Sequence, residues 1–145
     1  MEDGKRKELS RVLGGLEALK ELDRLSERDQ MLQKNRYAHR FQELKKAVIL
    51  PTLREFMVDL DRKGHLTRLW EKAPEKVRLD VQIQTRVPKR GAIEFSLSKA
   101  DPSKLRVDYG WATGDSRFQE ELYNLERVEA GFVADRILHL LKGLL

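Results

Sequence analysis

The residues that come closest to a known chemical pattern lie between Asp59 and Trp70. Asp59, Asp61 and Gly64 occupy the first, third and sixth positions of a calcium-binding EF-hand loop. The fifth position is Lys63, whose charge would repel calcium, and the twelfth is Trp70, where the loop needs a bidentate glutamate. We therefore predict that this segment is the end of a helix stopped by Gly64, and that it binds no metal.

Neither the histidines nor the glycines form a catalytic or nucleotide-binding motif. His39, His65 and His139 have no histidine four residues away and no HExxH motif around them. The run from Gly110 to Gly114 lacks both GK[ST] and GxGxxG, so we interpret it as a loop between strands. We expect no catalytic residue, metal ligand or cofactor. An enzyme whose site is assembled from scattered residues is the third of three functional hypotheses.

Basic residues form two groups with the chemistry to contact phosphates. The segment from Lys34 to Lys46 and the hairpin tip from Arg86 to Arg90 are both rich in cations. The residues that would make the contacts are Arg36, Arg40, Lys45, Lys89 and Arg90. The chain as a whole has 29 Lys or Arg against 24 Asp or Glu, a mixture typical of a solvated surface. A dimer that binds nucleic acid is therefore the second hypothesis, and it is not favoured.

The composition indicates a charged globular protein. Of 145 residues, 37% are charged and 40% are hydrophobic, which suits a single folded domain with an appendage. There is no cysteine, so disulfides do not stabilise the fold. No run of residues approaches the apolar length of a membrane span. We expect a cytoplasmic protein with no membrane partner.

The chemistry-bearing residues must be positioned by a helical arm, which we place at residues 1–72. Residues 8–46 are mainly good helix formers and contain no proline. At roughly 100° of rotation per residue, the apolar residues from Leu9 to Leu19 share one direction, and those from Leu22 to Leu32 lie roughly 150° away. One heptad seam would not turn in this way, so we prefer two helices, 8–25 and 27–50, divided at Ser26. A single long helix is the open alternative.

The second half of the arm contains further expected boundaries. Pro51 lacks an N–H, so the helix should kink or restart there. We expect Leu66, Leu69 and Trp70 to form a last turn that folds back onto the core.

Residues 73–145 predict a small α+β head domain. Apolar residues alternate with polar ones in three runs, from Val77 to Val87, from Ile93 to Leu97 and from Leu105 to Trp111. Short connections make the strands an antiparallel meander of three strands, or four if residues 118–125 add one. A C-terminal helix should cover the sheet through one apolar stripe. Its residues are Val133, Ile137, Leu140, Leu141 and Leu144.

The alternation also bears on function. All apolar residues of the three runs have odd numbers, so Phe95, Tyr109 and Trp111 should lie in the core. A sheet that recognises RNA needs aromatic residues on its open face, and the pattern predicts that this one lacks them.

The arm gives the leading hypothesis. An apolar stripe too long to be buried on so small a sheet predicts a partner, either a second copy of the chain or another helix. The expected contacts are Leu16, Leu19, Leu22, Leu25, Leu32, Phe41 and Leu44. We predict a non-enzymatic interaction or assembly module, a homodimer formed through a coiled coil or helical hairpin. The alternative, in which the arm is covered by its own chain, stays open.

Overall fold

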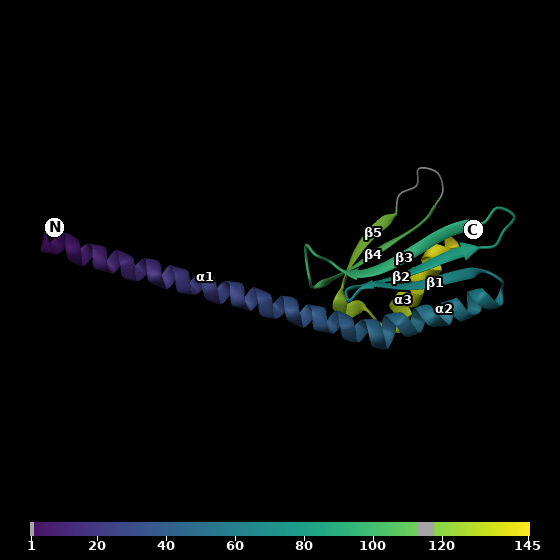
Figure 1. The fold of residues 1–145 in the computed structure, drawn as a ribbon, viewed down its shortest axis with the longest axis horizontal. Helices are drawn as coiled ribbons and strands as arrows, with labels where there is room; N and C mark the ends of the chain where they lie inside the picture. Colours follow the sequence, from purple (N-terminus) through teal and green to yellow (C-terminus); the bar gives the residue numbers. More distant parts are fainter. Residues whose placement is uncertain (1, 113–117) are drawn as a thin grey trace. The chain divides into compact units, whose positions relative to one another are not determined.

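The computed structural model describes residues 2–112 and 118–145, except for the side chain of Lys72. The chain forms two compact units, Met1–Arg36 and Tyr37–Leu145. The first unit belongs to a helix, whereas the second holds the sheet and the other helices (Figure 1). The end of the expected loop, from Thr113 to Gly114, lies outside the described residues.

The N-terminal helix α1 runs without interruption over Asp3–Leu44, which is 42 residues. The preferred division into two helices at Ser26 is therefore wrong, and the open alternative of one long helix is what forms. A serine costs a helix only about 0.5 kcal/mol relative to alanine, and its Leu, Glu and Arg neighbours are strong helix formers. No local penalty is large enough to end the helix at this point.

The helical path continues through the π-helical segment η1 (Lys45–Ile49) into α2 (Leu50–Arg62). Pro51 lies in the first turn of α2 and has no N–H to donate to the preceding turn. A π segment is a common site of helix bending, and the path bends here (Figure 1). The interruption expected at Pro51 takes this form.

Helix α2 ends in a Schellman motif at Gly64, as the sequence predicted. Gly64 has a φ of 86°, a left-handed conformation that glycine adopts without steric cost. Its N–H donates to the carbonyl of Asp61 at 3.0 Å, and the N–H of His65 donates to that of Leu60 at 3.1 Å.

Five strands then form one antiparallel sheet in the order β1-β2-β3-β4-β5. They are β1 (Leu66–Ala73), β2 (Lys76–Ile83), β3 (Lys89–Leu97), β4 (Lys104–Trp111) and β5 (Gln119–Asn124). The α+β class and the antiparallel meander are confirmed, but the expected count of three to four strands is too low. The additional strand is β1, which pairs with β2 where a helical turn was expected.

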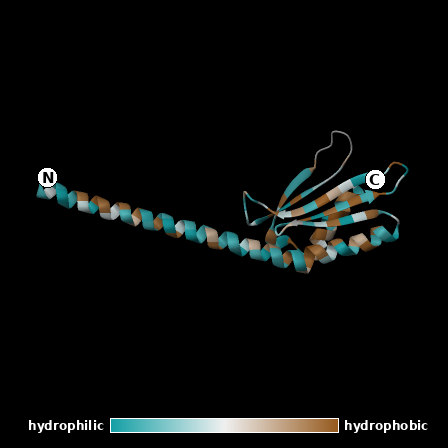
Figure 2. Cartoon of the chain, viewed as in Figure 1, coloured by the Kyte–Doolittle hydropathy of each residue, from teal (hydrophilic) through white to brown (hydrophobic). Residues whose placement is uncertain are grey.

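The two faces of the sheet differ as the alternation predicted. Odd-numbered residues of β2, β3 and β4 face a core that they share with α2 and with the C-terminal helix α3 (Ala130–Lys142). A 3₁₀ turn, η2 (Leu125–Arg127), connects β5 to α3. Phe95 and Tyr109 are buried, and the predicted α3 stripe packs on them through Val133, Ile137 and Leu140. Figure 2 shows hydrophobic and hydrophilic residues alternating along the strands.

Candidate functional site

The open face of the sheet, which carries the even-numbered residues, is hollowed near the start of β3 and the end of β4. Pairing places Arg68 opposite Asp80, Asp80 opposite Ala92, and Ala92 opposite Gly110. The ring of Phe118 closes this row, because a Cβ on Gly110 would lie 2.8 Å from the ring atom Cδ1. The floor of the hollow lies close to the backbone because Ala92 and Gly110 have almost no side chain.

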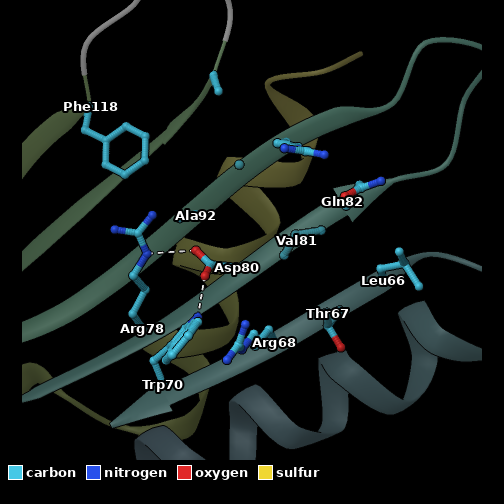
Figure 3. Close-up of a pocket in the computed structure, with 13 residues that line it drawn as sticks. Leu66, Thr67, Arg68, Trp70, Arg78, Asp80, Val81, Gln82, Ala92 and Phe118 are labelled. Atoms are coloured by element: carbon cyan, nitrogen blue, oxygen red, sulfur yellow. Dashed lines mark hydrogen bonds and ion pairs between the residues drawn. The ribbon is translucent and has the colours of Figure 1, made fainter. Parts of the chain in front are cut away.

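The hollow has a volume of about 650 Å³, within the range of sites for small ligands. Trp70 and Leu66 of β1 line it at one edge of the sheet, and Phe118 lines it at the other (Figure 3). Both aromatic rings belong to the open face.

Charge in the hollow is mainly positive. Asp80 is the single acidic residue among the described residues that line it. Its carboxylate accepts hydrogen bonds from Nε1–H of Trp70 at 2.5 Å and from Nε–H of Arg78 at 2.7 Å. Arg78 therefore balances Asp80, and the indole bond fixes the position of the Trp70 ring.

Two other arginines line the hollow without a carboxylate partner. The guanidinium carbon of Arg68 lies 3.5 Å from the centroid of the Trp70 ring, a cation–π contact. Arg90 lies opposite Gln82 at the start of β3. Within the described part of the chain, no acidic group is in ion-pair distance of Arg68 or Arg90. Their charges are thus available to an anionic ligand.

The opposite end of the open face has a different balance. Arg106 forms ion pairs with Asp108 at 2.9 Å and with Glu120 at 3.2 Å. Glu94 lies opposite Asp108 and adds a further negative charge. Arg106 is therefore neutralised by its acidic neighbours, unlike Arg68 and Arg90.

A polar cluster under β5 connects the sheet to α3. The carboxylate of Glu121 accepts hydrogen bonds from the hydroxyls of Tyr109, at 2.5 Å, and of Tyr123, and from Nη1–H of Arg136 at 3.0 Å. Burial, together with the hydrogen bond to Glu121, raises the pKa of Tyr109 to about 12. The cluster is fully used in holding α3, so we assign it a structural role.

The structure separates the expected self-association residues into two sets. Five of them are between 44% and 63% exposed: Leu16, Leu19, Leu22, Leu25 and Leu32. Phe41 and Leu44 are buried in the core of residues 37–145. Those two side chains already have partners within their own chain.

The five basic residues proposed for nucleic acid do not form one surface. Lys45 is buried, pairs with Glu71 at 3.3 Å and reaches the carbonyl of Pro74, two residues before β2 begins. Lys89 pairs with Ile83 at the other end of β2, about 23 Å away by the rise of an extended strand. Arg40 is paired with Glu43 at 3.1 Å, and Arg36 belongs to the other compact unit. Lys89 and Arg90 are adjacent in β3, and Arg90 lines the hollow.

Sequence reasoning missed Trp70 and Phe118, the two aromatic residues of the open face. Trp70 was assigned to a helical turn, but it belongs to β1, where it shares a face with Leu66 and Arg68. The turn at residues 74–75, followed at once by the run of β2, was the available signal for a hairpin. The open face therefore has the aromatic residues that it was expected to lack.

The histidines have structural partners. His65 Nδ1 accepts a hydrogen bond from the N–H of Gln84 at 3.0 Å, and His139 makes an edge contact with Tyr109. Across residues 2–112 and 118–145, no group of three or more His, Asp or Glu side chains could hold a metal ion.

Comparisons with known proteins give no family assignment: no family model, no curated protein and no solved structure matches this chain. Among the described helices, none combines the length and the apolar composition needed to span a membrane. Two surfaces described above are the candidates for function, the exposed aliphatic residues of α1 and the hollow.

Proposed function

We propose that this protein is a non-enzymatic interaction module that self-associates through residues 3–36 of α1. The observation that supports this most is the exposure of large aliphatic side chains along the helix. Each of the following is at least 44% exposed: Leu9, Val12, Leu13, Leu16, Leu19, Leu22, Leu25, Met31 and Leu32. Exposed apolar surface of this kind is typical of a protein interface, and burying it gains roughly 25 cal/mol per Å².

The helix has little else to stabilise it. Its intrahelical ion pairs, Lys20 with Glu17 and Arg24 with Glu21, are exposed, and such pairs contribute only about 0.2–0.5 kcal/mol each. Most helices in proteins depend on packing of an apolar face more than on propensity. A partner for the aliphatic residues would supply that packing.

The aliphatic residues form two clusters. The Leu9 cluster consists of Leu9, Val12, Leu13, Leu16 and Leu19, and the Leu22 cluster consists of Leu22, Leu25 and Leu32. Because α1 is one unbroken helix, a rotation of roughly 150° between them places the clusters on nearly opposite sides. A parallel or antiparallel homodimer covers one cluster of each chain. Association of more than two such helices covers both.

Light scattering after size-exclusion chromatography tests the proposal. At micromolar concentration we expect a multiple of the chain mass of 17.0 kDa. Changing both Leu16 and Leu19 to glutamate should lower the mass, because two charges cannot be buried in an apolar contact without a large cost. The matched control is Arg28→Glu, which changes charge at a position that the same rotation places between the clusters.

A monomer over the whole concentration range would contradict self-association. It would favour the alternative in which the arm is covered by its own chain. Equal loss of mass in the double variant and in Arg28→Glu would show that the contact is electrostatic and does not use the Leu9 cluster.

We also propose a cytoplasmic location. The chain contains no cysteine, and proteins of oxidising compartments commonly use disulfides. Fractionation of cells expressing a tagged chain tests this, and recovery in a secreted or membrane fraction would contradict it.

A further inference from the structure

We propose that the hollow on the open face of the sheet binds single-stranded nucleic acid, with bases stacking on Trp70 and Phe118 and phosphates at Arg68 and Arg90. All four residues belong to the unit Tyr37–Leu145. The inference therefore stands on different side chains from those proposed for self-association, and it goes beyond that function.

The aromatic residues supply the stacking surfaces. The Phe118 side chain is 40% exposed, its ring packs on Gly110, and the guanidinium carbon of Arg78 lies 5.7 Å from the ring centroid. The ring of Trp70 is oriented by its hydrogen bond to Asp80. Rings that are held in place lose little conformational entropy when a flat ligand stacks on them. Every base has a π face, so aromatic residues of this kind bind bases with little regard to sequence.

The floor of the hollow allows a base to enter. Ala92 and Gly110 occupy the centre of the row between Arg68 and Phe118. A longer side chain at either position would fill the space that a ring needs. A flat aromatic ligand therefore fits the hollow better than an aliphatic one.

The charges favour an anionic ligand. Arg68 and Arg90 are free of ion pairs with the described residues, whereas Arg78 is paired with Asp80. Lys89, next to Arg90 at the start of β3, is also exposed. Arginine binds phosphate through paired hydrogen bonds as well as through charge. The combination of stacking rings with available guanidinium groups is that of a nucleotide unit.

The open geometry of the hollow favours a single strand over a duplex. The row from Arg68 to Phe118 crosses all five strands, about 19 Å at the usual strand spacing. An extended polynucleotide can pass over such a surface and place one base in the hollow. Bases of a duplex are stacked and paired, and inserting one would first require it to be extruded. The preference for a single strand follows.

Fluorescence anisotropy of a short labelled oligo(dT), titrated with the whole protein at low salt, tests the inference. Phe118→Ala should weaken binding about tenfold or more, the usual effect of removing one stacking ring. Leu122→Ala is the matched control, because Leu122 is 51% exposed on the same face and lies outside the hollow. It should change affinity by less than about twofold, since no base stacks on it.

The electrostatic part of the site has its own matched pair. Arg90→Glu should weaken binding about tenfold and reduce the dependence of affinity on salt, because a phosphate contact is lost. Arg86→Glu makes the same change of charge in the exposed β2–β3 turn, away from the lining of the hollow. It should have a clearly smaller effect.

Several results would overturn the inference. One is the absence of binding by the unchanged protein. Another is an equal loss of affinity in Arg90→Glu and Arg86→Glu while Phe118→Ala keeps its affinity. A third is duplex DNA that binds as tightly as the single strand. Thymidine monophosphate that competes as well as the oligonucleotide would also overturn it, because the site would then be one for a free nucleotide. Circular dichroism melts of each variant check folding. Light scattering of the same samples shows whether self-association fails, independently of nucleic-acid binding.

Discussion

One compact unit of this protein buries several of its leucine side chains, and the other leaves its leucine side chains exposed. In Tyr37–Leu145, Leu53, Leu79 and Leu105 are completely buried. In Met1–Arg36, Leu16 and Leu19 are 48% and 59% exposed. Both units contain apolar residues at a regular period, so the periods do not explain the difference. The second unit supplies its own covering layer, and the aliphatic residues of the first have none among the described residues.

This difference separates two kinds of stability. The second unit buries its core within one chain, so its free energy of unfolding should not depend on protein concentration. If the first unit is stabilised by association, its helix content should depend on concentration through mass action. A substitution in the second unit should change the free energy of unfolding, and one in the first unit should change how helix content depends on concentration.

The largest expected effect comes from the core of the second unit. Phe95 is completely buried in β3, the central strand of the sheet, and Phe95→Ala should lower the free energy of unfolding by about 3–5 kcal/mol. Both tryptophans of the chain lie in this unit, so their fluorescence during urea unfolding reports on it. The control Leu19→Ala should leave this transition within about 0.5 kcal/mol. A comparable shift in both variants would show that the units do not unfold independently.

A smaller effect is expected from the close contact between β3 and the ring of Trp111. A Cβ at Gly91 would lie 2.5 Å from ring atom Cε3. The ring cannot move away freely, because its Nε1–H donates to the carbonyl of Leu140 at 2.8 Å. Gly91→Ala should therefore cost about 1–3 kcal/mol in urea unfolding. Gly131→Ala is the control, since nothing lies within 4 Å of a Cβ there, and no loss in the Gly91 variant would contradict the close contact.

The next effect depends on pH. The pKa of Tyr109 is raised from 10.0 to about 12 in the folded state, so the folded protein holds this proton more tightly than the unfolded chain. That contribution is complete below pH 10 and is lost as pH rises towards 12. The loss should be on the order of 1 kcal/mol near pH 11. Urea unfolding at several pH values should show a flatter alkaline decline for Tyr109→Phe, and equal declines would contradict this account.

Most of the second unit was accessible from the sequence because burial on one face of a sheet requires strict alternation. The runs containing Val77, Phe95 and Val107 are strands with their odd residues in the core, and the α3 stripe covers them. The strand β1 was missed because Leu66 and Trp70 face outward while Leu69 faces inward. Its apolar residues are divided between two faces, so no alternation of polarity marks it.

The hollow could not be predicted for a related reason. Its residues come from β1, β2 and β3, with Ala112 after β4 and Phe118 before β5, and their proximity follows from the register of pairing. That register places Ala92 beside Gly110 and brings Arg68 into the same row. In the first unit the sequence predicted helix, but the weak capping signal at Ser26 could not decide between one helix and two. Propensity accumulated over the surrounding residues outweighed it.

The smallest expected effect comes from glycine-to-alanine substitutions in α1, which should stabilise the helix, whereas Gly91→Ala should destabilise the second unit. Gly14 and Gly15 lie inside α1, and nothing is within 4 Å of a Cβ at either position. Replacing each with alanine should stabilise the helix by about 0.5–1 kcal/mol, because alanine has less conformational freedom to lose. Circular dichroism during dilution measures this, and the helix signal of the double variant should persist to lower concentration. The tryptophan transition of the second unit should not move. If the variant instead lost helix signal or association mass, a partner helix would have to approach closely at Gly14 and Gly15. These two residues would then mark the crossing point of the helices in the assembly.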